Sequence, residues 1–298
     1  MRILAAITFL ILAAAGAMAQ ESAPPLDSPE IRQLSEAADQ AVQRGELSLA
    51  WRHRVDAGNL LARQNTQPAM QRAADFYRGA LELVSREKTP KQWAVTQALL
   101  GNVLYDAGVR FKSVKEIEEA VVAYRAALSE YSVERQPAEW ATLQNRLGEA
   151  FSYLALRGQP DKYDEAMAAW RAALTVYSKD KFRSEWIAIQ QSIGFTYLVK
   201  AQLHDKGTDS LKAALTAFTA TLDVVSRDTD LPKWSETQLA IGEVQRRLGD
   251  RLADKDAFTA ALAAFEQARD GFAQAGDAAR TGTLVAKIAE IKGKLAGK

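Results

Sequence analysis

The chain of 298 residues contains no cysteine at all. This absence excludes disulfide bonds, thiolate metal sites and cysteine nucleophiles. Histidine is almost absent too, because only His53 and His204 occur, far apart and without partners at metal-ligand spacing. We therefore interpret both histidines as surface residues and predict neither a metal site nor a cofactor.

Recognisable catalytic motifs are also lacking. The sequence has no glycine-rich phosphate loop, no nucleophile elbow and no zinc motif, so we predict no catalytic residue. Two carboxylates that only folding brings together would leave no motif in the sequence. An enzyme therefore stays as the third interpretation of function.

Neither sign of charge predominates. The chain has 38 lysine and arginine residues against 37 aspartate and glutamate residues, a formal net charge of +1. Residues 1–19 hold one of these arginines, Arg2, and no acidic residue, so the rest of the chain is neutral. Because non-specific binding to nucleic acid needs a net basic field, we expect no nucleic-acid partner.

A hydrophobic run long enough to cross a bilayer is missing. The longest apolar run, residues 3–15, falls short of the roughly 20 residues that a spanning helix needs. It follows Arg2 and precedes the string Ala-Met-Ala at 17–19, which is typical of a signal-peptide cleavage site. We predict a signal peptide over residues 1–19, cut after Ala19, and a periplasmic or secreted mature chain without stable membrane insertion. The alternative is an uncleaved anchor.

What the sequence does contain is a repeat of 46 to 48 residues. Its marker is the string W-x-x-x-Q-x-x-[LI]-G, which occurs at residues 93–101, 140–148, 186–194 and 234–242. A period of this length indicates stacked copies of one supersecondary unit instead of a single globular core. The repeat therefore determines the predicted fold class.

Each repeat has a second half that also follows helical spacing. A large aromatic residue stands sixteen residues before each marker tryptophan, with an alanine four residues earlier and a small residue three residues later. These aromatic residues are Tyr77, Tyr124, Trp170 and Phe218, and Phe265 continues the series. Offsets of three and four place the small and aromatic side chains on one helix face.

The repeat glycines carry a prediction about packing. A glycine inside a helix costs about 1 kcal/mol relative to alanine. Because four copies accept this cost, we expect each glycine to permit close contact between the first helix and the aromatic residue of the second. The tryptophans and glutamines of the marker string share the apolar arc of the first helix, so we expect them in the packing as well.

Prolines and serines at fixed places in the repeat predict where the helices begin and end. Pro90, Pro137 and Pro232 lie two or three residues before a marker tryptophan, a place that suits the first turn of a helix. Residues 89–92 have the form of a capping box. Four serines that precede the tryptophans by eight residues are expected to end the second helices; they are Ser85, Ser132, Ser178 and Ser226.

These residues resemble the tetratricopeptide repeat family, whose first helix carries Leu-Gly and whose second carries an Ala-aromatic-Ala stripe. The longer period and the tryptophan one helical turn earlier are similar to long-form bacterial repeats. The resemblance implies an all-α right-handed solenoid of about five helical hairpins. It also implies that the first helices line a concave surface that binds a protein or peptide.

The repeats divide the chain as follows. Residues 20–27 form a flexible lead, and residues 28–298 form the solenoid domain. Within it, we expect a capping helix at 28–46, repeats at 47–88, 89–135, 136–181, 182–229 and 230–276, and a C-terminal capping helix at 277–298.

The predicted binding residues lie on the first helices and point away from the apolar arc. They are Asn59, Asn102, Tyr105, Asn145, Glu149, Tyr153, Gln191, Phe195, Glu243, Arg246 and Arg247. Amides, aromatic rings and both signs of charge suit a polypeptide ligand. We therefore predict an exported, non-enzymatic scaffold that binds a protein or peptide. The alternative is a periplasmic binding protein for a small molecule or an envelope polymer.

Overall fold

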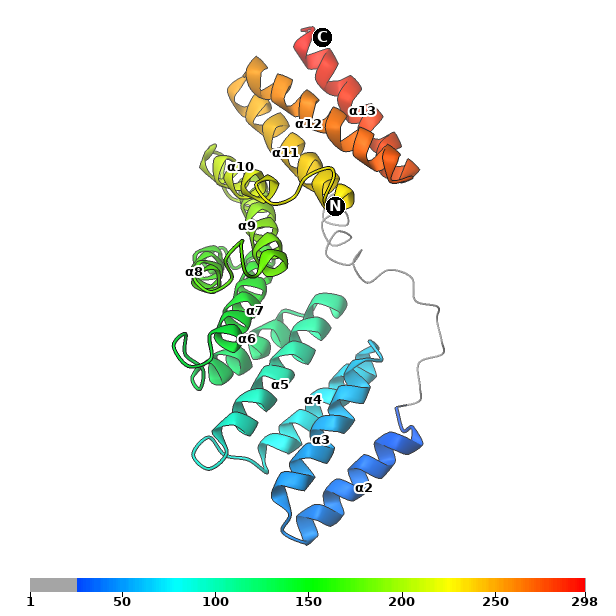
Figure 1. Cartoon of the computed structure of the whole chain (residues 1–298), viewed down its shortest axis with the longest axis vertical. Helices are drawn as coiled ribbons and strands as arrows, with labels where there is room; N and C mark the ends of the chain where they lie inside the picture. The colour runs from blue at the N-terminus through cyan, green and yellow to red at the C-terminus, as the bar shows by residue number, and fades with distance from the viewer. Residues whose placement is uncertain (1–25, 298) are drawn as a thin grey trace. The chain divides into compact units, whose positions relative to one another are not determined.

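The computed structural model describes residues 26–297, and over this range the chain folds into twelve α-helices without a strand (Figure 1). The all-α prediction is therefore confirmed. The predicted signal peptide lies outside the described residues. In the part of the chain that is described, no helix is long and apolar enough to cross a membrane.

The described chain divides into two compact units, one ending at Leu83 and the other beginning at Val84. The first unit contains α2 (Pro29–Gln43), α3 (Leu47–Ala62) and α4 (Gln67–Leu81). The second contains α5 (Pro90–Phe111), α6 (Val114–Leu128), α7 (Pro137–Leu156), α8 (Lys162–Leu174), α9 (Arg183–Leu203), α10 (Asp209–Leu222), α11 (Leu231–Leu252), α12 (Lys255–Gln274) and α13 (Ala278–Leu295).

Consecutive helices pair into hairpins, as Figure 1 shows for α5 with α6 and for α11 with α12. The second unit holds four such hairpins followed by α13, which packs on α12. The first helices of neighbouring hairpins also touch, because α7 contacts both α5 and α9, and α9 contacts α11. Neighbouring second helices of this unit approach one another less closely, so the first helices form the inner side of the stack.

The prolines begin helices where the sequence predicts. Pro90 and Pro137 are the first residues of α5 and α7, and Pro232 is the second residue of α11. The missing N–H of proline costs nothing there, because the first turn has no intrahelical acceptor for it.

The predicted capping box at the start of α5 is wrong. Thr89 makes no side-chain cap on the helix. Its hydroxyl instead accepts the backbone N–H of Ser85 at 3.1 Å and donates to the Ser85 carbonyl at 3.2 Å. The four repeat serines lie in the turn beyond the helix ends, where the carbonyl of each accepts an N–H four residues later. They shape the loop between repeats and do not end the second helices.

The contact between each repeat glycine and the aromatic ring of its second helix is confirmed. A Cβ atom added to Gly101 would lie 2.7 Å from the ring of Tyr124, and one on Gly148 would lie 2.5 Å from the indole of Trp170. The same overlap recurs in the other three hairpins, between Gly58 and Tyr77, Gly194 and Phe218, and Gly242 and Phe265. Each aromatic side chain is at most 2% exposed, so these rings form the core of the repeat.

The marker tryptophans contribute less to the core than their position in the apolar arc suggests. All four are half-buried, whereas Trp170 of α8 is 1% exposed. The rings of Trp93 and Trp234 are covered instead by the guanidinium groups of Arg86 and Arg227, each 5.9 Å from the ring centroid. The first helix therefore presents its tryptophan at the border between the core and the surface.

Candidate functional site

The face shared by α5, α7, α9 and α11 is the candidate binding surface, which we call the first-helix face. It carries ten of the eleven predicted binding residues, and Asn59 belongs to α3 in the first unit. All eleven side chains are half-buried. Half-buried aromatic and polar groups leave part of their surface for a ligand while neighbouring helices limit their rotamers.

Three of the predicted residues are hydrogen-bond partners of the core. The side-chain oxygen of Asn59 accepts the hydroxyl of Tyr77 at 2.8 Å, and that of Asn102 accepts the hydroxyl of Tyr124 at 2.9 Å. Asn145 accepts the indole N–H of Trp170 at 3.0 Å. Because buried polar atoms need a partner, these asparagines satisfy the core aromatics, and we leave them out of the proposed binding surface.

A cluster of polar groups joins α5 to α7 in the centre of the first-helix face. Arg146 pairs with Glu149 at 2.9 Å, and Asn145 donates to the same carboxylate at 3.1 Å. Burial raises the pKa of Tyr105 well above its usual value, and the nearby Glu149 raises it further. Tyr105 therefore stays a neutral hydroxyl at every physiological pH and can act as a hydrogen-bond donor.

Tyr153 links the same two helices one turn further along. Its hydroxyl donates to the carbonyl of Gly108 at 3.2 Å, and the guanidinium of Arg157 lies 5.0 Å from its ring centroid. On α9, Phe195 packs edge-on against the core ring of Phe218 with 5.0 Å between centroids. These two aromatic side chains are held in place by the fold, so little conformational entropy is lost when a ligand covers them.

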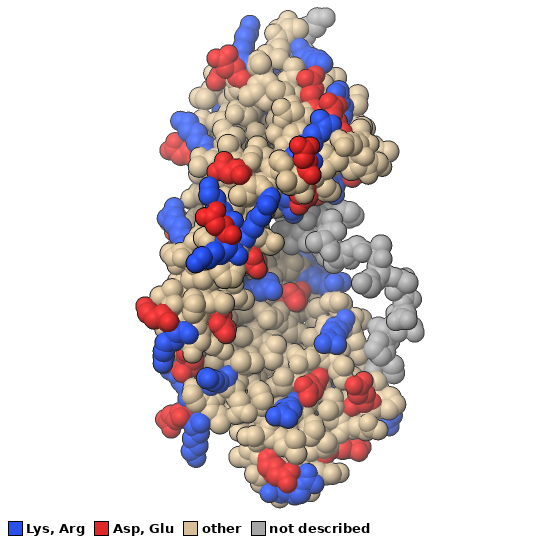
Figure 2. Space-filling view, viewed as in Figure 1, with Lys and Arg blue, Asp and Glu red and all other residues tan. Residues whose placement is uncertain are grey.

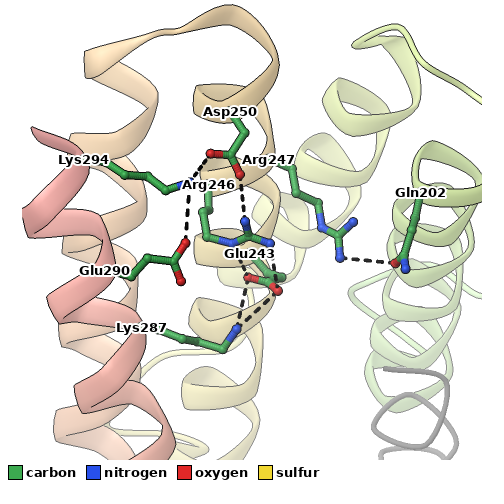
Figure 3. Close-up of polar contacts among 8 residues, drawn as sticks. All are labelled: Gln202, Glu243, Arg246, Arg247, Asp250, Lys287, Glu290 and Lys294. Atoms are coloured by element: carbon green, nitrogen blue, oxygen red, sulfur yellow. Dashed lines mark hydrogen bonds and ion pairs between the residues drawn. The ribbon is translucent and has the colours of Figure 1, made fainter. Parts of the chain in front are cut away.

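At the end of the chain, α11 and α13 share an ion-pair network (Figure 3). Arg246 pairs with Glu243 at 3.0 Å and with Asp250 at 2.8 Å. Lys287 of α13 adds a contact to Glu243 at 3.3 Å, and Lys294 pairs with Asp250. Although burial alone would raise the pKa of Glu243, Arg246 and Lys287 lower it overall. This network holds the C-terminal helix against α11.

Arg247 stands apart from this network. Figure 3 shows its side chain extending from α11 toward Gln202 of α9, whose side-chain oxygen it contacts at 3.2 Å. Gln191, also on α9, lies 3.5 Å from the hydroxyl of Thr237 on α11. Side chains of the first-helix face thus bridge α9 and α11, as they bridge α5 and α7.

Charges of both signs alternate over the surface that Figure 2 shows, without a broad area of one sign. This distribution agrees with the balanced composition of the chain. In the described part of the chain, no three histidine, cysteine, aspartate or glutamate side chains are grouped so that they could hold a metal ion. The first-helix face therefore offers hydrogen bonds, aromatic rings and single charges.

Sequence reasoning missed three residues of this face: Asp106, Arg146 and Gln202. Their positions in the helix did not separate them from ordinary solvated residues. Gln202 accepts from Arg247 of the neighbouring repeat, Arg146 pairs with Glu149 of its own helix, and Asp106 has no ion pair in the described chain. The role of the asparagines did have a sequence signal. Asn follows the repeat glycine in the two hairpins whose core ring is a tyrosine, and it is absent there when the ring is phenylalanine.

No protein-family model matches the chain, and no curated protein matches it. The crystal structure of BtubC (BKLC) from P. vanneervenii is similar at 17% identity and a TM-score of 0.48, over 91% of this chain and 94% of that one. The Rap protein complexed with competence and sporulation factor is 13% identical with a TM-score of 0.41, over 90% and 76% of the two chains.

The TPR2AB domain of yeast Sti1 in its complex with pHSP90 is 14% identical with a TM-score of 0.25, over 89% of this chain and 98% of that one. Similarities this distant do not indicate which partner the present chain binds or whether it has an activity. The fold is assigned from the packing of the chain's own helices. Five hairpins pack a repeat glycine against a buried aromatic ring, and the fold is an all-α stack of such helical hairpins.

Proposed function

We propose that this protein is an exported, non-enzymatic scaffold that binds a protein or peptide partner on its first-helix face. The observation that carries the proposal is the continuity of this face across four repeats. Adjacent first helices are in contact from α5 to α11, and the face offers Tyr105, Tyr153 and Phe195 as half-buried rings. Aromatic side chains surrounded by polar groups are the usual hot spots of protein interfaces.

The export part of the proposal rests on residues 1–19, and it has its own test. The mature chain is expected to begin at Gln20, because small residues precede that position in the pattern that signal peptidase recognises. Intact-mass measurement of the protein recovered from its native envelope or medium checks this expectation. A mass that retains residues 1–19 would instead support a membrane anchor.

The binding part of the proposal is tested with paired substitutions on the first-helix face. A partner retained from an envelope extract by the immobilised chain is purified, and its affinity is measured by calorimetry. Tyr153→Ala combined with Phe195→Leu is expected to weaken binding about tenfold or more, equivalent to about 1.4 kcal/mol. Leucine at residue 195 keeps an apolar side chain against Phe218, so the core of that repeat stays filled.

The matched control is Val122→Ala on the second helix α6, where the side chain is 69% exposed. It removes apolar surface from the opposite side of a hairpin and should leave affinity unchanged. Circular dichroism must show the same helix content in all variants. If Val122→Ala weakens binding and the aromatic pair does not, the partner lies on the second helices and the proposal is wrong.

A further inference from the structure

Two charged side chains on the first-helix face, Asp106 and Arg247, have no ion-pair partner among the described residues, and they are of opposite sign. Starting from the function proposed above, we infer that the ligand is an extended peptide segment with a basic side chain at Asp106 and an acidic side chain at Arg247. This inference specifies which charge of the ligand lies at which end of the first-helix face and how far apart the two charges are.

Arg247 is a guanidinium whose hydrogen-bonding capacity is mostly unused. Its Nη2 donates to Gln202, a neutral acceptor, and its buried Nε has no acceptor among the described residues. No carboxylate of the described chain lies within 4.0 Å of it. A buried donor without a partner costs about 1–3 kcal/mol, so an arginine in this state needs an explanation.

The carboxylates near Arg247 in the described chain form their ion pairs with other cations. Among the residues of Figure 3, four are basic and three are acidic, and the carboxylates of Glu243, Asp250 and Glu290 all pair with Arg246 or with lysines of α13. Arg251, one turn further along α11, donates to backbone carbonyls instead of a carboxylate. Burial lowers the pKa of Arg247; Glu243 and Asp250 raise it, and Arg246 and Arg251 lower it, so that the pKa lies below the usual value overall. An incoming carboxylate would offer it the bidentate geometry that arginine prefers.

Asp106 on α5, at the other end of the first-helix face, is an acidic side chain without an ion pair in the described chain. Its carboxylate has no ion pair within 4.0 Å in the described chain, because Arg146 is engaged by Glu149. The side chain of Asp106 is exposed at the surface, although neighbouring groups partly desolvate its carboxylate and so raise its pKa; Arg146 and Arg110 lower the pKa, and Glu149 raises it. A lysine or arginine of a ligand would form the ion pair that this exposed carboxylate does not make within the described chain.

The two residues occupy the same place in the repeat. Asp106 and Arg247 each stand five residues after a repeat glycine, and Tyr153 holds the equivalent position in the hairpin between α7 and α8. Packed helices lie about 8–10 Å apart, so three steps from α5 to α11 cover about 27 Å. An extended chain rises about 3.3 Å per residue, which separates the two ligand charges by about eight residues.

Selection of displayed random peptides on the chain from Gln20 onward tests this inference. Peptides of about twelve residues are long enough to span the four helices. Selected peptides should carry a basic and an acidic residue about eight positions apart. Arg247→Glu should weaken the peptides selected on the unchanged chain about tenfold or more, and it should itself select peptides with lysine or arginine at the former acidic position. Asp106→Lys should change the other position in the same way.

Arg171→Glu on the second helix α8 is the matched control, since it reverses the charge of an exposed arginine elsewhere. It should leave the selected sequences unchanged. If peptides bind with competition by the partner but keep the same sequences in Arg247→Glu and Asp106→Lys, the charge inference fails and the proposed function stands. If no peptide binds the chain while the purified partner still does, the peptide inference fails and the proposed function stands. Unchanged helix content by circular dichroism separates these outcomes from misfolding.

Discussion

Replacing Gly148 by alanine is expected to destabilise the chain by about 1–3 kcal/mol, although alanine is the better helix former. The added Cβ would lie 2.5–2.7 Å from atoms of the Trp170 indole, which is fully buried and cannot swing into solvent. Either α8 must move away from α7 or the indole must leave its position, and both disturb the packing of the hairpin. The midpoint of urea unfolding, followed by circular dichroism, measures the change.

Gly282→Ala is the matched control, because Gly282 lies within α13 and an added Cβ would meet no atom within 4 Å. Only helix propensity acts there, so this variant should be more stable by up to about 1 kcal/mol. The two substitutions are chemically identical and are expected to have opposite signs. Equal effects would show that the glycine of the repeat is not needed for close packing.

Replacing Trp170 by alanine should have the largest effect of any single substitution, about 3–5 kcal/mol. The indole is 1% exposed, so its removal leaves a large cavity between α7 and α8. The same change leaves the side-chain oxygen of Asn145 without its donor. Because a stack of repeats can unfold in parts, the experiment should follow both tryptophan fluorescence and helix content.

Trp140→Ala provides the comparison within the same hairpin. Trp140 is half-buried at the start of α7, so its loss should cost less than about 2 kcal/mol. A cost for Trp140→Ala as large as that for Trp170→Ala would place the repeat tryptophan in the core. That outcome would contradict the packing described above.

The arrangement of the core also explains how the first-helix face is held rigid. Asn102 and Asn145 lie on this face, and their side chains are fixed by hydrogen bonds to Tyr124 and Trp170 beneath them. Tyr153 is fixed by the backbone of the neighbouring α5. Substitutions at the asparagines should therefore act on stability first. Charge reversals at Asp106 or Arg247 should act on binding, because neither has an ion-pair partner within residues 26–297.

The repeat itself was readable in the sequence. Helical periodicity depends on local geometry, and a strict spacing of Trp, Gln, Gly and the distant aromatic residue leaves one architecture, the stack of hairpins. The contact of Gly101 with Tyr124 could also be predicted, because a costly glycine beside a small-aromatic-small stripe has a packing reason. Helix starts at Pro90 and Pro137 follow from the covalent structure of proline.

Only the tertiary structure determined the role of the Thr89 hydroxyl, the burial of the marker tryptophans and the partners of the charged side chains. The Thr89 hydroxyl can cap a helix or close the turn with Ser85, and only the path of the chain selects the second. The marker tryptophans share the apolar arc with core residues, yet the angle between packed helices leaves them at the border of the core. The partner of a charged side chain can come from about 45 positions away in a neighbouring repeat, as Gln202 does for Arg247. A single helix contains no information about such neighbours. Arg247 was therefore predicted as a binding residue without its unpaired state, and Asp106 was found only in the packed hairpins.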